Sequence, residues 1–128
     1  MALIRSVRPG KAALCLALLL VFPGLLFGQV TPSPGKAVLL EFSRPGCPIC
    51  ARMEKVLQDV AARYPDRLEV RLVVREHHEH LFKEYRVVFV PTLIVLDAAG
   101  KELFRRETPI SRVELLQKLR VLGLIPRE

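Results

Sequence analysis

Two short segments of this chain carry residue types that could do redox chemistry. The first is Cys47-Pro48-Ile49-Cys50, which directly follows an apolar run at 37–42. At the start of a helix, this spacing places the two sulfurs one turn apart, so that one can attack a disulfide while the other waits. The second segment is Val90-Pro91-Thr92, at the start of another apolar run. Together the two segments favour thiol–disulfide exchange more strongly than either does alone.

A helix that begins at Pro48 would make the two cysteines unequal. Cys47 would be the N-cap residue and Pro48 the first helical residue, where a missing N–H costs nothing. The helix N-terminus stabilises negative charge, so we expect the pKa of Cys47 to lie below the free value of about 8.5. We therefore predict Cys47 as the nucleophile and the more buried Cys50 as the resolving cysteine. The alternative is a structural disulfide or two buried thiols, but so short a closed loop would stabilise the fold little.

The elements that must position these residues follow from the apolar pattern. Continuous or alternating apolar runs predict strands, and apolar residues at three- and four-residue spacing predict helices. Ser111 and Glu114 form a capping box that opens the last helix, and Gly123 and Pro126 end it. The predicted strands are 37–42, 68–74, 92–96 and 101–106, and the predicted helices are 48–64, a short one within 76–85, and one from 111. This order predicts an α/β fold with one central mixed four-stranded sheet and helices on both faces.

This arrangement resembles the thioredoxin family over nearly all of residues 37–124. The Cys-x-x-Cys segment lies between the first strand and the first helix, and Glu41 stands six residues before Cys47, where thioredoxins carry a buried carboxylate. Val90-Pro91-Thr92 matches the cis-proline loop of the family. The extra N-terminal strand and helix of the family have no room here. The departure at Arg44-Pro45-Gly46, where the family usually has tryptophan before the first cysteine, reads as a tight turn or as added positive potential.

The resemblance implies a site around the cysteine pair. Pro91 is expected to follow a cis peptide bond and to place the backbone of Val90 beside Cys47, where a substrate strand can pair with it. Without the resemblance, Pro91 would be an ordinary proline at the first residue of a strand. The residues expected to contact substrate are Val90, Thr92, Pro48 and Ile49.

Glu41 is the one acid in an otherwise apolar strand. Burial would raise its pKa and make it a candidate to relay the proton of Cys50. The alternative is a glutamate that faces an edge or forms a salt bridge. The lysine that accompanies this carboxylate in thioredoxins is replaced by Leu72, which changes how the pair would be tuned.

The first 28 residues have the pattern of an export signal. Basic residues at 5, 8 and 11 precede an unbroken apolar segment at 12–22, and Pro23-Gly24 follow. We expect residues 1–28 to be a cleaved signal peptide or an N-terminal membrane anchor, 29–36 a linker, and 37–125 the folded domain. The domain would then be periplasmic or otherwise extracytoplasmic, where disulfides persist. Cys15 lies inside the apolar segment, which leaves two cysteines for the domain.

Charge and composition limit the classes of molecule that the domain could bind. The formal net charge is +7, of which the first 28 residues carry three basic charges. The remaining charges are mixed in sign and form no nucleic-acid-binding motif. We expect a monomer with no cofactor beyond the cysteine pair. Its partners would be proteins that bear disulfides or thiols, and a membrane protein could supply electrons.

The favoured function is an exported thiol–disulfide oxidoreductase, with a slight preference for reduction because of Glu41. One alternative is a soft-metal module in which the cysteines and a histidine hold Cu(I), and another is a redox-silent interaction domain. His77, His78 and His80 are close in sequence, but their spacing is more typical of a solvated helix start, and we predict no metal site.

Overall fold

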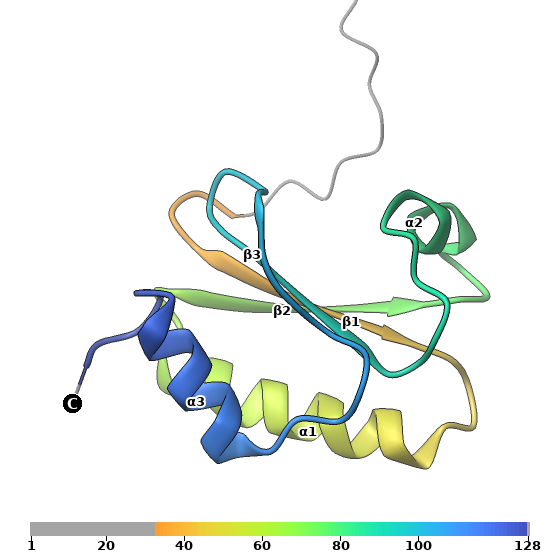
Figure 1. The fold of residues 1–128 in the computed structure, drawn as a ribbon, viewed down its shortest axis with the longest axis horizontal. Coiled ribbons are helices and arrows are strands. Elements are labelled where there is room, and N and C mark those ends of the chain that lie inside the picture. The colour runs from red at the N-terminus through yellow and green to blue at the C-terminus, as the bar shows by residue number, and fades with distance from the viewer. Residues whose placement is uncertain (1–32, 128) are drawn as a thin grey trace, which may run out of the picture.

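The computed structural model describes residues 33–127 and holds four strands and three helices in the predicted order (Figure 1). The sequence expectations for residues 1–28 and for 29–32 of the linker lie outside this range. No helix within residues 33–127 is both long enough and apolar enough to cross a membrane. The elements are β1 (Ala37–Ser43), α1 (Pro48–Arg63), β2 (Leu68–Val74), α2 (Glu79–Glu84), β3 (Thr92–Leu96), β4 (Glu102–Arg106) and α3 (Arg112–Val121).

The strands form one mixed sheet in the order β2-β1-β3-β4. β1 pairs in parallel with β2 through the α1 crossover, while β3 is antiparallel to both β1 and β4. In this register Glu41 lies opposite Leu72 on one side and Leu93 on the other. The mixed four-stranded sheet predicted from the sequence is confirmed.

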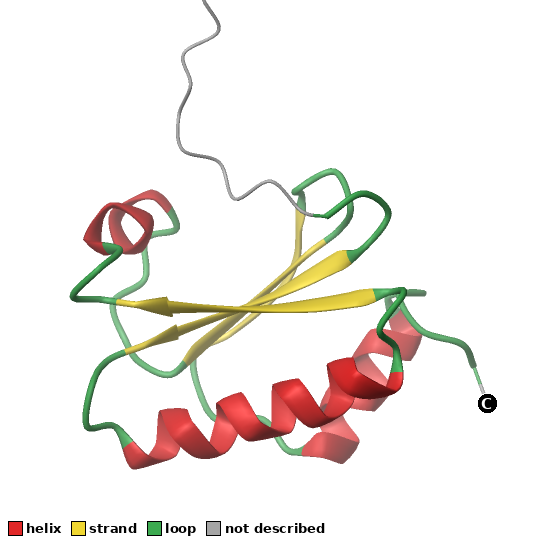
Figure 2. Ribbon diagram, turned by 180° about the vertical axis from the view of Figure 1, so that it is seen from behind, coloured by secondary structure: helices red, strands yellow, loops and turns green. Residues whose placement is uncertain are grey.

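Helices cover both faces of the sheet, as predicted. α1 and α3 lie on one face and α2 on the other (Figure 2). Alternate residues of β1 therefore join different cores: Leu39 packs with residues of α1 and α3, whereas Phe42 packs with residues of α2. The cysteine pair lies at the start of α1 and therefore belongs to the layer that α1 and α3 form on this face.

The ends of the helices are fixed by local chemistry. Ser111 and Glu114 form the predicted capping box at the start of α3. Gly123 follows that helix with φ +72, a left-handed conformation that favours glycine, and Leu124 N–H donates to Leu119 O. α2 lies within the window predicted for it, and residues 75–77 before it form turns, with the N–H groups of His77 and His78 donating to Val74 O.

Candidate active site

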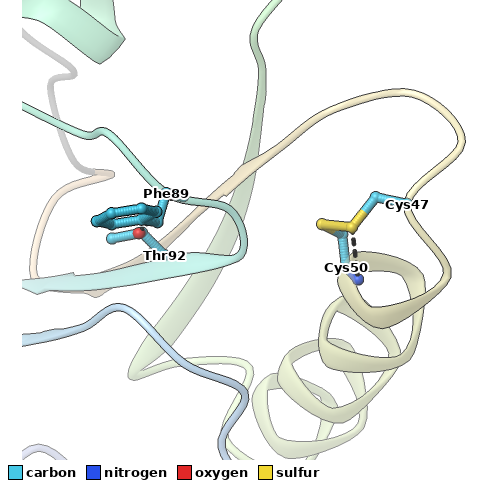
Figure 3. The surroundings of a disulfide bond; sticks show 4 residues. All are labelled: Cys47, Cys50, Phe89 and Thr92. Atoms are coloured by element: carbon cyan, nitrogen blue, oxygen red, sulfur yellow. Dashed lines mark hydrogen bonds between the residues drawn. A yellow bond between two sulfur atoms is a disulfide. The ribbon is translucent and has the colours of Figure 1, made fainter.

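The two cysteines of the Cys-x-x-Cys segment form a disulfide at the N-terminus of α1 (Figure 3). Cys47 is the N-cap residue, and its Sγ accepts a hydrogen bond of 3.2 Å from the backbone N–H of Cys50. Pro48 occupies the first turn, where its missing N–H leaves no helical hydrogen bond unmade. Cys47 is partly exposed, whereas Cys50 is buried. The sulfur that solvent and substrates can reach is thus the one at the positive end of the helix.

The turn before Cys47 explains a departure in the sequence. Gly46 has φ +67, a left-handed conformation that a side chain rarely adopts. Arg44 and Pro45 complete this exposed turn between β1 and α1. Gly46 therefore stands where the backbone needs glycine.

A second turn faces the disulfide from the start of β3. The Val90–Pro91 peptide bond is cis, as the resemblance implied. The turn that joins Phe89 to Thr92, and so contains this bond, points toward the two sulfurs in Figure 3. The Thr92 hydroxyl is buried and donates to Phe89 O at 2.7 Å. Thr92 thereby holds the turn closed, and its side chain does not reach the surface.

Glu41 lies in the middle of β1 with no exposed area. Neither of its carboxylate oxygens has a hydrogen-bond partner among residues 33–127. Burial, and after it the negative charge of Glu54, raises the pKa of Glu41 from 4.5 to about 8. Glu41 is therefore mostly protonated at neutral pH. The alternatives of an edge-facing or salt-bridged glutamate do not match this geometry.

A groove of about 480 Å³ runs along the β2 side of the disulfide. Its floor is apolar and comes from β2, while charged side chains stand on the β1–α1 turn and on α1. The lining includes Arg44, Cys47, Ala51, Glu54, Leu72 and Val74.

The family of the chain follows from comparison with known proteins. Residues 29–122 match the family model described as a thioredoxin-like domain. This chain belongs to the thioredoxin-like domain family. A putative thioredoxin H10 of Arabidopsis thaliana is 37% identical over 62 residues, covering 48% of this chain and 40% of that relative. A chloroplastic thioredoxin Y of rice is 26% identical over 93 residues, covering 73% of this chain and 55% of the relative.

The fold is shared with solved thioredoxin structures. Thioredoxin-2 of a malaria parasite, described as a component of protein secretion machinery, has a TM-score of 0.65 at 20% identity and matches 70% of this chain and 86% of its own. The chain spans only about half the length of the two plant relatives.

Exposed apolar side chains in the turn that faces the cysteines, and in the first turn of α1, are the feature that the sequence reasoning missed in part. Val88 is 69% exposed, Phe89 62% and Ile49 44%. Ile49 was predicted as a substrate contact, but Val88 and Phe89 were not. The available signal was an apolar pair outside any predicted strand, directly before the Val90-Pro91-Thr92 segment. The backbone of Val88 is tied to the end of β2, because Arg75 Nη2 donates to Val88 O at 3.3 Å.

The domain brings together most of the residues predicted for its site. Cys47, Cys50 and Glu41 lie on the α1 side of the sheet, and Val90 and Pro91 lie in the facing turn. Within residues 33–127, no group of three or more histidine, cysteine or acidic side chains is placed to hold a metal ion. His78 is instead the N-cap residue of α2.

Proposed function

We propose that this chain is a thiol–disulfide oxidoreductase that exchanges disulfides with proteins through Cys47 and Cys50. The observation that carries the proposal is the asymmetry of the pair at the start of α1. Cys47 is accessible and accepts the Cys50 N–H, whereas Cys50 is 1% exposed. An accessible thiolate at a helix N-terminus is the form of cysteine that attacks disulfides.

Reduction of a substrate would proceed in two displacements. The Cys47 thiolate attacks one sulfur of the substrate disulfide, forming a mixed disulfide and releasing the other substrate sulfur as a thiolate. Cys50 then gives its proton to a base and attacks Cys47 Sγ. This step closes the Cys47–Cys50 bond and releases the second substrate thiolate. The same steps in reverse would oxidise a dithiol.

Glu41 is the base we propose for the second displacement. It is buried on the face of β1 that α1 covers, and among residues 33–127 neither of its oxygens has a hydrogen-bond partner that competes for a proton. A raised pKa makes its carboxylate a stronger base than an exposed glutamate. In the reverse direction the protonated Glu41 would return its proton to Cys50.

The surface around Cys47 suits an extended segment of a protein. The backbone of Val90 would pair with a substrate strand. Pro48, Ile49 and Phe89 are exposed and would contact its side chains. Thr92 would contribute through the turn that it stabilises rather than by direct contact.

We further propose that the domain works outside the cytoplasm as a monomer and favours reduction. The apolar segment at 12–22, preceded by basic residues, supports export. A reductase in that compartment needs electrons, and a membrane donor is the source we favour. The decisive measurement is the reduction potential of the pair. A value near −270 mV, about that of thioredoxin, would support a reductase, whereas one near −120 mV would indicate an oxidant.

Trapping tests the exchange itself. In a Cys15→Ser background, the reduced Cys50→Ser variant should accumulate a disulfide-linked complex with insulin, whose disulfides Cys47 attacks. The Cys47→Ser variant should accumulate no such complex. A copper module would lose Cu(I) binding with either change and trap nothing. Equal trapping by both variants would contradict the assignment of Cys47 as the nucleophile.

A further inference from the structure

Glu54 is a second acid close to the proposed proton relay. It stands one helical turn beyond Cys50 on α1, is half-buried, and lines the same groove as Cys47. Gln58 Nε2 donates to Glu54 Oε1 at 2.8 Å, which restrains the carboxylate. The floor of that groove includes Leu72, the strand neighbour of Glu41.

The surroundings of Glu41 hold few charges. Leu93 is its partner on β3, and the α1 side of β2 presents only apolar side chains. Arg44 lines the groove from the turn after β1, but it is not among the groups that shift the pKa of Glu41. On α1, Cys50 is uncharged in the disulfide and Glu54 carries the charge that Glu41 senses. The β2 residues that present apolar side chains to this face are Val70, Leu72 and Val74.

We propose that Glu54 is a positioning residue that acts through Glu41, because its carboxylate beside the groove makes the buried Glu41 hold the proton that Cys50 releases. The inference rests on the proposed exchange function. No lysine opposite Glu41 offsets this effect, since Leu72 occupies that place. Glu54 touches no substrate atom in this scheme. Its role is to keep Glu41 a strong proton acceptor in the resolving step.

The size of the effect follows from electrostatics in a partly buried setting. A carboxylate disfavours a second negative charge nearby, and burial weakens the screening by water. The negative charge of Glu54 stands second to burial among the causes that raise the pKa of Glu41. Removing that charge should lower the pKa of Glu41 by about 0.5 to 1 unit.

The direct test is a carboxyl titration of Glu41 by carbon NMR in the disulfide form. Glu54→Gln should lower the Glu41 midpoint, and Asp59→Asn is the matched control. Asp59 lies on the same helix and is exposed, so this variant removes one negative charge away from the groove. A Glu41 midpoint that moves no further in E54Q than in D59N would overturn the proposal.

The kinetic test uses Ellman's reagent on the reduced protein. The first thionitrobenzoate released reports attack by Cys47, and the second reports displacement by Cys50. Glu41 must be unprotonated to accept the Cys50 proton, so the second step should speed up as pH rises through the Glu41 pKa. E54Q should move this rise to lower pH by the same shift as in the titration. In a Glu41→Gln background the E54Q shift should vanish.

The outcomes separate this inference from the proposed function. The role of Glu54 would be refuted if E54Q left unchanged the pH at which the second step accelerates. It would also be refuted if E54Q still shifted that pH in the Glu41→Gln background. Failure of the wild-type protein to release a second thionitrobenzoate would refute the exchange function instead. The NMR titration would still report on the pair of carboxylates.

Discussion

Glu41 and Leu72 are direct partners across the parallel β1–β2 pair, so an unpartnered buried acid lies beside an aliphatic side chain. The resemblance to thioredoxins implies a lysine at the position of Leu72. Among the residues that the structure describes, no cation offsets the desolvation of Glu41. Both the stability of the domain and the proton transfer we propose depend on this relationship.

Stability should fall as pH rises because of Glu41. Its pKa is about 8 in the folded chain against 4.5 ordinarily, so the folded state binds the extra proton between these two values. The penalty is absent below about pH 4.5 and complete above about pH 8. The free energy of unfolding should drop by on the order of 5 kcal/mol across this window. Urea unfolding at stepped pH would measure it.

The control is a variant without the titrating group. Glu41→Gln should lack this part of the pH dependence, whereas Glu76→Gln, which changes an exposed acid, should retain it. A wild-type stability that rises over the same window would contradict the assignment.

Restoring a cation opposite Glu41 should reverse the effect. Leu72 is 38% exposed, so Leu72→Lys can keep its ammonium group near solvent while its charge faces the strand partner. We expect the pKa of Glu41 to fall by about 1 unit or more. The loss of stability with rising pH should shrink accordingly. Leu72→Met is the matched control, because it alters the side chain without adding charge and should leave the titration in place.

The two cysteines should differ in reactivity once reduced. Cys47 is accessible at the N-terminus of α1, and Cys50 is buried. Iodoacetamide at pH 7 should therefore alkylate Cys47 at least about ten times faster than Cys50. Mass spectrometry of digested samples taken over time would show the order. Comparable rates, or Cys50 reacting first, would contradict the proposed roles.

The sheet and the place of the cysteines could be predicted because local sequence patterns determine them. The apolar runs of β1 and β3 and the helical spacing in α1 are long and regular. Glu41 could be expected to be buried because its strand is apolar on both sides. That α1 sets Glu54 over the groove could not be predicted, because this depends on how the helix is rotated against β2.

The exposed Val88 and Phe89 illustrate a second limit. Apolar residues ahead of a strand are read as its beginning or as core, since burial is the usual fate of valine and phenylalanine. Only the three-dimensional path of the turn shows that their side chains remain outside. The positive φ of Gly46 is similar, because a lone glycine does not reveal which backbone conformation it adopts.

Phe89 should contribute to the recognition of protein substrates. It is 62% exposed in the turn that faces the disulfide, so Phe89→Ala should leave the free energy of unfolding within about 0.5 kcal/mol. Loss of its apolar contact should raise KM for insulin reduction and lower kcat/KM by about tenfold. The rate with Ellman's reagent, which is too small to use this surface, should be unchanged. Val113→Ala, which changes a residue of similar exposure (64%) on α3, should alter neither rate.

Thr92 should act by holding the turn rather than by touching substrate. Its buried hydroxyl donates to Phe89 O at 2.7 Å, so Thr92→Val keeps the shape of the side chain but removes the donor. We expect the free energy of unfolding to fall by about 1 kcal/mol and insulin reduction to slow, because Phe89 and Val90 lose their fixed place. Thr92→Ser retains the hydroxyl and should restore the rate of insulin reduction even though it leaves a small cavity. Denaturant titration and insulin kinetics on the two variants would test this. Loss of activity in Thr92→Ser but not in Thr92→Val would show that the methyl group, not the hydrogen bond, positions the turn.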